Sequence, residues 1–263
     1  MIPHKLHFIF GLTPDFGGKP FSFCHWAAIR SAQIKNEGWD TTVWTAFEPS
    51  GRYWEAIKPH VEVREIETPA AVFGNSIPHP AHKCDWLRLQ VLKEHGGVYL
   101  DCDTITVKPF GPLLTEPATM VTEFAYNELV GLCNAFIASE PESEFIIKWI
   151  NKFKGFRSIG RDQHWNESAV KWPHELWHNG ADVTAMMSES FMQPDWTPDG
   201  IDAMFEHEEQ FPFAYGHHLW ESFSWGYLSG YTPENYDGFP CTYARLLKEV
   251  LGETIQSELL NHA

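Results

Sequence analysis

Residues 82–110 read HKCDWLRLQVLKEHGGVYLDCDTITVKPF, and this stretch decides the fold. It predicts a helix over residues 81–95, a glycine pair that ends it, a short buried strand at 98–100 and an acidic tip. Asp101 and Asp103 of the tip would point the same way, as residues i and i+2 of an extended chain do. Such carboxylates favour a bound Mg²⁺ or Mn²⁺. The alternative is an ordinary acidic turn.

The predicted helix before this tip carries a D-x-x-R pair. Asp85 and Arg88 are three residues apart and are therefore neighbours on a helix surface. Taken alone, the pair reads as a surface ion pair, which contributes about 0–1 kcal/mol. Cys84, Leu87 and Val91 form the apolar stripe that would face the core.

The N-terminal region predicts a parallel βαβ unit. Residues 5–10 (KLHFIF) form an apolar run that ends at Gly11, residues 21–37 have helical periodicity, and residues 41–47 (TTVWTAF) favour a strand. Strand, helix and strand at this spacing are typical of α/β domains. In such domains, a nucleotide site lies beyond the carboxyl ends of the strands.

The remainder of the chain predicts further strands and helices. We expect strands at 61–66, 104–107 and 119–124. Helices are expected over 52–59, 142–153 and 243–260, and another one starting within 180–187.

Two features of the second half are candidates for ligand contacts. Asn134 lies in the otherwise apolar run LVGLCNAFIA, where its amide either satisfies the core or contacts a ligand. His217 and His218 lie in the aromatic segment 211–225, where a histidine either binds a metal or diphosphate or has a structural role.

Charge and composition exclude some functions. The chain has 263 residues and a net charge of −16, which argues against nucleic acid and anionic membranes as partners. Its 12 Trp residues pack in the core or form platforms for sugar rings and bases. Five scattered cysteines suggest free thiols in a reducing compartment. No apolar run reaches ~18 residues, and residues 1–15 lack the long apolar region typical of a signal peptide, so we expect a cytoplasmic protein without a transmembrane segment.

Three blocks of the sequence resemble the DXD-containing sugar transferases. This family includes capsular and lipo-oligosaccharide glycosyltransferases, the yeast initiating mannosyltransferase and α-1,4-galactosyltransferases. The blocks are IPHKLHFIFG at 2–11, HKCDWLRLQVLKEHGGVYLDCD at 82–103 and HLWESFSW at 218–225. The second block is the most specific of the three. Two departures concern Phe10, where the family usually has a base-stacking Trp, and residues 178–181 (HNGA), where it has T-G-P.

The resemblance implies one α/β domain of the GT-A type over residues 1–263, with a Rossmann-like, mostly parallel sheet flanked by helices. Residues 1–110 would bind the nucleotide sugar, and residues 111–263 would bind the acceptor and close the site. It also implies a metal-dependent, retaining transfer of a hexose to a glycan acceptor, with Mn²⁺ or Mg²⁺ as cofactor. A UDP-sugar is the favoured donor, and GDP-mannose is the other candidate.

The resemblance also assigns roles to individual residues. The implied metal ligands are Asp103, Asp101 and His218. His217, Glu221 and Ser224 are alternatives to His218. The implied catalytic residues are Asp101, Asp103, Arg88 and, near the reacting face, Asp182. The implied substrate-binding residues are Phe10, Asp85, Arg88, Asp101, Asn134, Trp220 and Trp225.

Two other functions fit parts of the pattern. A DxD-type phosphatase would use Asp101 as the nucleophile and Asp103 as the acid/base, but it needs a further acidic pair, which we do not find after residue 110. A non-catalytic carbohydrate-binding protein would explain the aromatic residues. It would not require Arg88 and the two aspartates together.

Overall fold

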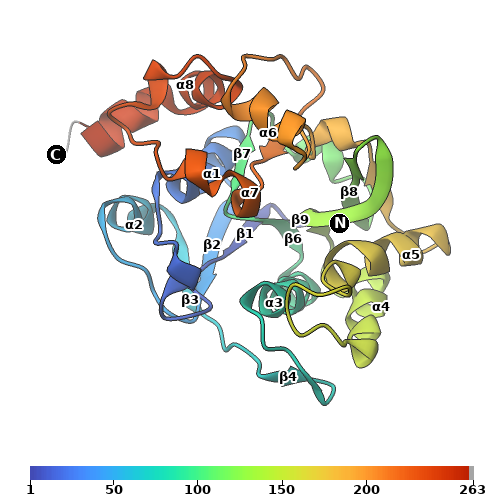
Figure 1. Cartoon of the computed structure of the whole chain (residues 1–263). Coiled ribbons are helices and arrows are strands. Elements are labelled where there is room, and N and C mark those ends of the chain that lie inside the picture. Colours follow the sequence, from blue (N-terminus) through green and yellow to red (C-terminus); the bar gives the residue numbers. More distant parts are fainter. Residues whose placement is uncertain (261–263) are drawn as a thin grey trace.

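A computed structural model describes residues 1–260 of the chain; the last three residues of the expected domain, 261–263, lie outside the described residues. Its main sheet has seven strands in the order β10-β8-β9-β6-β1-β2-β3 (Figure 1). Six strands run in one direction, and β9 is antiparallel to both of its neighbours. The strands are β1 (Lys5–Ile9), β2 (Asp40–Thr45), β3 (Glu62–Glu65), β6 (Gly97–Leu100), β8 (Ala118–Ala125), β9 (Glu128–Ser139) and β10 (Thr184–Met186).

Helices cover both faces of the sheet, which gives two apolar cores (Figure 1). One core joins the sheet to α1 (Phe23–Lys35) and α8 (Thr242–Ile255), and the other joins it to α3 (Pro80–His95) and α4 (Glu144–Lys152). Strand β6 serves both cores, because Val98 and Leu100 face the first and Tyr99 faces the second. The remaining α-helices are α2 (Arg52–Ile57), α5 (Trp172–His178), α6 (Pro198–Phe205) and α7 (Glu221–Leu228).

The turn from α3 into β6 explains the glycine pair of the sequence. Gly97 has a φ of +99°, and a Cβ atom there would lie 2.8 Å from the Lys5 carbonyl oxygen. Only glycine permits this close approach of β6 to β1. The turn thereby fixes where β6 begins, and therefore where Asp101 emerges.

A small second sheet links the two halves of the chain. Strand β7 (Thr104–Thr106) leaves the main sheet and pairs antiparallel with β11 (Gly216–His218). In this register His218 lies opposite Thr104, one residue after Asp103. The pairing therefore brings the late histidine next to the acidic tip. A separate hairpin is formed by β4 (Ala71–Val72) and β5 (Asn75–Ser76).

Most predicted elements are confirmed, and one is wrong. Strands β1 and β2 are parallel neighbours with α1 between them in sequence, as the βαβ prediction requires. The helix expected to start within 180–187 is absent from the described chain, where residues 184–186 form β10 instead. They pair in parallel with the open edge of β8, and this edge outweighs the local helical pattern. Helices α5, α6 and α7 were not predicted.

All five cysteines are unpaired in residues 1–260. Within the same residues, every helix is too short or too polar to cross a bilayer.

Candidate active site

A cavity of about 520 Å³ opens at the carboxyl end of β6. It lies beside the carboxyl end of β6 and the β8–β9 pair, at the edge of the sheet where open α/β sheets usually bind ligands. Its walls come from six parts of the chain: the start of α3, the acidic tip, the β8–β9 pair, the segment 161–170, Trp196 and the segment 218–223. The cavity therefore collects residues that are distant in sequence.

Arg88 fixes the first aspartate of the tip. Its guanidinium Nη1 lies 2.9 Å from Asp101 Oδ1 and donates to the Asn134 carbonyl at 2.7 Å. The guanidinium also lies over the Tyr99 ring at 4.5 Å, and the Tyr99 hydroxyl donates to Asp101 Oδ1 at 2.7 Å. Burial raises the pKa of Asp101, and Arg88 opposes this effect. Arg88 and Asp101 thus form an ion pair in which the cation is buried and the carboxylate is 22% exposed. Arg88 Nη2 also lies 3.5 Å from Asp85 Oδ1, and both of these side chains are buried, so the Asp85–Arg88 pair is not the surface ion pair that its spacing alone suggests.

Asp85 and Asn134 form a second buried network beside it. The Asn134 Nδ2 donates to Asp85 Oδ1 at 2.7 Å, and the Ser168 hydroxyl donates to Asp85 Oδ2 at 2.8 Å. Both residues also line the cavity. Asn134 therefore satisfies a buried carboxylate and is part of the cavity wall at the same time. Ser168 was not predicted, because it approaches Asp85 only through folding of the segment 161–170.

Asp103 is held by residues from the C-terminal region. His218 Nε2 lies 3.3 Å from Asp103 Oδ2, and the Glu221 backbone N–H donates to the same oxygen at 2.7 Å. Burial acts to raise the pKa of Asp103, but His218 and this N–H outweigh it and hold the pKa below its usual range. His218 in turn has a raised pKa, because Asp103 outweighs the effect of burial on the imidazole.

The structure separates His218 from the three alternatives to it. His217 points to the opposite side of β11, where its Nδ1 contacts the Gln193 carbonyl. The Ser224 hydroxyl donates to the Leu219 carbonyl within its own segment. Glu221 directs its backbone N–H, and not its carboxylate, at Asp103. Among these residues, His218 has the side chain that faces the tip.

Asp101, Asp103 and His218 fit a divalent cation. Their candidate ligand atoms all lie within 4.8 Å of one another. Two carboxylates and an imidazole are a donor set that Mn²⁺ and Mg²⁺ accept. His218 presents Nε2 to this site, since Nε2 lies 3.3 Å from Asp103 Oδ2, while the buried Nδ1 has no hydrogen-bond partner within residues 1–260.

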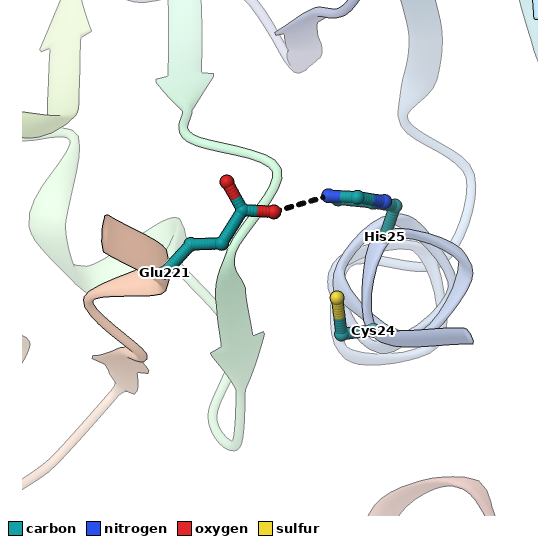
Figure 2. Close-up of side chains that lie close together, drawn as sticks. All are labelled: Cys24, His25 and Glu221. Carbon is teal, nitrogen blue, oxygen red and sulfur yellow. Dashed lines mark hydrogen bonds and ion pairs between the residues drawn. The ribbon is translucent and has the colours of Figure 1, made fainter. Parts of the chain in front are cut away.

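A second cluster, Cys24, His25 and Glu221, has similar residue types (Figure 2). His25 Nδ1 accepts the Ser22 backbone N–H at 2.9 Å, so Nε2 carries the proton that it donates to Glu221 Oε1 at 2.9 Å. Lys19 binds the other carboxylate oxygen at 2.9 Å. Through these contacts, Glu221 of α7 is anchored to His25 of α1 and to Lys19 in the loop that precedes α1.

The structure places the three aromatic candidates differently. Trp220 lines the cavity, and its indole N–H donates to the Pro194 carbonyl at 2.9 Å. Phe10 lies outside the residues that line the cavity; its ring is 4.8 Å from that of His25. Trp225 also lies outside this lining, with Lys19 Nζ 5.2 Å from the centre of its ring.

Asp182 is not brought to the cavity. It is exposed and precedes β10, whereas Asp101 follows β6. Because β6, β8 and β10 run in the same direction, the start of one strand and the end of another lie at opposite edges of the sheet. We therefore leave Asp182 out of the proposed site.

Sequence reasoning missed several residues of the cavity wall, above all Glu123. This carboxylate is only 6% exposed and accepts the Trp196 indole N–H at 3.0 Å. Burial raises its pKa. A lone acid in the apolar strand ATMVTEFA was the available signal. The other missed wall residues include Arg161, Asp162, Trp165, Trp196 and Phe223.

Comparison with known proteins finds a family match that includes the acidic tip. Residues 25–120 match the family model described as a glycosyltransferase sugar-binding region containing a DXD motif. The chain is 30% identical to Glucan organizing enzyme 1 of Cryptococcus neoformans var. grubii over 96% of its own length and 71% of that protein. It is also 30% identical to Inositol phosphoceramide mannosyltransferase 1 of Schizosaccharomyces pombe over 31% of its length and 25% of that protein.

The fold also matches a solved structure. The apo form of the WbbM bifunctional glycosyltransferase aligns with a TM-score of 0.52 at 10% identity. The alignment covers 98% of this chain and 52% of that one. The mostly parallel sheet and this likeness identify the GT-A fold.

Proposed function

Because the chain belongs to the glycosyltransferase family whose sugar-binding region contains a DXD motif, we propose that it transfers a hexose from a nucleotide sugar to a glycan acceptor. The transfer would depend on a divalent cation and retain the anomeric configuration. One observation carries the proposal: Asp101, Asp103 and His218 converge on the wall of the cavity. A UDP-sugar is the first donor to test, and the likeness to a mannosyltransferase is a reason to include GDP-mannose.

The acidic tip is suited to a diphosphate that carries a cation. Asp101, Asp103 and His218 would hold Mn²⁺ or Mg²⁺, which when bound offsets the negative charge that builds on the leaving diphosphate. Arg88 adds fixed positive charge behind Asp101. Such local charge is necessary, because a chain with a net charge of −16 otherwise repels an anionic donor.

The Asp85–Asn134 network supplies polar groups for the transferred sugar. Both side chains are nearly buried, with 5% and 7% exposure, and both line the cavity. Their mutual hydrogen bond fixes their orientation before a ligand arrives. Pre-oriented groups of this kind bind sugar hydroxyls without losing side-chain entropy.

The proposed reaction proceeds by attack on the face from which the diphosphate leaves. The bond between the anomeric carbon and the phosphate oxygen breaks, and a bond to the acceptor hydroxyl oxygen forms. The hydroxyl proton passes to the leaving phosphate oxygen. The buried carboxylates of Asp85 and Glu123 already accept hydrogen bonds from protein groups, which favours this route over a covalent sugar intermediate on either one.

The surroundings of Asp103 argue against the phosphatase alternative. In that reading Asp103 would have to donate a proton as the acid/base, but His218 and the Glu221 backbone N–H hold its pKa below the usual range and favour the charged carboxylate. The family match also favours sugar transfer over phosphate hydrolysis. We therefore favour a binding role for both aspartates of the tip.

A donor screen tests the proposal. The protein is incubated with a panel of UDP- and GDP-sugars, with Mn²⁺ or with a chelator, and nucleotide release is measured. We expect release from one donor only when the metal is present. Release that does not depend on metal, or cleavage of a phosphomonoester without release from any donor, would contradict the proposal.

A further inference from the structure

Three aromatic side chains form a continuous track at the mouth of the cavity. Phe223 of α7 stacks on Trp196, with ring centres 5.5 Å apart and an interplanar angle of 16°. Tyr126, in the turn between β8 and β9, meets Trp196 edge to face at 5.8 Å. Phe223 is 60% exposed and Tyr126 is 68% exposed. The track thus presents apolar ring surface to solvent.

The track is continuous with the proposed active site. Trp196 and Phe223 line the cavity, and Tyr126 extends the row outward from them. Glu123, also in the cavity wall, fixes the Trp196 indole through its N–H at 3.0 Å. Ring surface next to a carboxylate is the combination that recognises a pyranose, because the C–H face of the sugar packs on the ring and its hydroxyls donate to the oxygens.

Folding alone does not account for Tyr126. Tyr126 and Asn127 form the two-residue turn of the β8–β9 hairpin, with φ values of +52° and +63°. Such turns favour Asn, Asp and Gly, and a bulky aromatic residue in this conformation is unusual. The ring is also largely outside the core. The position therefore favours a role for the exposed ring over a role in the turn.

We propose that Phe223, Trp196 and Tyr126 bind a neutral saccharide chain, which is the acceptor of the transfer. This inference rests on the proposed function, since the track leads to the cavity where the donor would lie. A neutral sugar fits better than an anionic one, because Glu123 lies beside the track and the chain carries a net charge of −16.

Direct binding tests the track without requiring turnover. Saturation-transfer NMR is recorded with maltohexaose, mannohexaose, laminarihexaose and chitohexaose at millimolar concentration. The variants are Phe223→Ala and Tyr126→Asn, and Phe213→Ala is the matched control because Phe213 is 73% exposed and lies outside the cavity lining. We expect one saccharide to bind the native protein and Phe213→Ala equally, and each track variant about tenfold more weakly.

Tyr126→Asn separates binding from folding. Asn suits the turn, so the melting temperature should stay the same or rise while saccharide affinity falls. Equal affinity in all variants, or no binding of any saccharide to the native protein, would overturn the inference. Nucleotide release in the donor screen would still support the proposed function in that case, so the two failures are distinguishable.

Discussion

Two clusters of histidine and carboxylate side chains lie close to Glu221, and they differ in how many of their polar atoms have partners within the protein. In the cluster of Cys24, His25 and Glu221, both nitrogens of His25 and both oxygens of Glu221 have protein partners. In the cluster of Asp101, Asp103 and His218, His218 Nδ1 has no partner within residues 1–260, and all three residues line the cavity. Similar residue types thus give a structural anchor in one place and a candidate cation site in the other.

Glu221 connects the two clusters. Its carboxylate binds Lys19 and His25, while its backbone N–H donates to Asp103. The anchor therefore positions the start of α7 against the acidic tip. We infer that a change in the anchor reaches the candidate cation site through this backbone contact and, more weakly, through the charge of His25, whereas a change in the tip acts on it directly.

The largest effect is expected for Asp103→Asn. This change removes a carboxylate charge from the candidate cation site while keeping the shape of the side chain. We expect nucleotide release to fall by about 10²–10³-fold, the size typical for loss of one electrostatic contact to a transition state. Mn²⁺ affinity, measured by isothermal titration calorimetry, should fall as well.

Cys24→Ala is the matched control for that change, because it alters the anchor cluster instead. It should leave Mn²⁺ affinity within about twofold, since this thiol lies outside the proposed ligand set. An equal loss of Mn²⁺ binding in both variants would contradict the assignment of one cluster as the cation site and the other as a structural anchor.

The acidic tip could be predicted because its pattern is local. Asp85, Arg88, Asp101 and Asp103 lie within 19 positions of one another in a single helix–turn–strand unit, and helical and strand periodicity indicate how they face. Local pattern left both His217 and His218 as possible ligands, and only the resemblance favoured His218, since its place beside the tip depends on the pairing of β11 with β7.

Residues whose position depends on distant pairing could not be predicted from local pattern. Glu123 reaches the cavity through the β8–β9 register, and Ser168 through folding of the segment 161–170. Asp182 was misplaced for a related reason. A helix was predicted there, and the strand that formed instead puts Asp182 at its beginning and away from the cavity edge.

Arg88→Met should have the next largest effect, and on stability as well as activity. Arg88 is 4% exposed and compensates the Asp101 carboxylate, whose side chain is 22% exposed. Removing one partner of a fully buried pair costs about 3–5 kcal/mol, and we expect the lower end of this range because the Asp101 carboxylate keeps some contact with solvent. Urea unfolding at neutral pH measures this loss.

The double variant Arg88→Met/Asp101→Asn should recover part of the stability but none of the activity, since it removes both charges. If Arg88→Met unfolds at the same urea concentration as the native protein, then Arg88 does not stabilise the fold by compensating the charge of Asp101.

Glu221→Gln should have a smaller effect, because it weakens the anchor and keeps the backbone N–H that holds Asp103. The Glu221 side chain is 22% exposed and pairs with Lys19 and His25. We expect a loss of about 1 kcal/mol in unfolding free energy. Mn²⁺ affinity should change by less than about tenfold. A loss as large as that of Asp103→Asn would instead place the Glu221 carboxylate in the cation site.

The smallest effect on cation binding is expected for His7, a buried histidine whose two ring nitrogens both have protein partners, as those of His25 do. The Trp44 indole N–H donates to His7 Nδ1 at 3.3 Å, so Nε2 carries the proton and donates to the Gly96 carbonyl at 2.9 Å. Burial lowers the pKa of His7 to about 4, although the Gly96 carbonyl opposes this. The unfolded chain, with an ordinary histidine pKa of 6.5, binds more protons between these pH values.

Stability should therefore decline as the pH falls from about 6.5 to about 4, and His7 should contribute to this decline. NMR titration of the His7 ring protons measures the pKa of this side chain directly. The His7 signals should stay those of a neutral ring until about pH 4 and should not respond to Mn²⁺, whereas the His218 signals should broaden when Mn²⁺ is added. A His7 ring that titrates near pH 6.5 would show that full hydrogen bonding does not keep a buried histidine neutral in this protein.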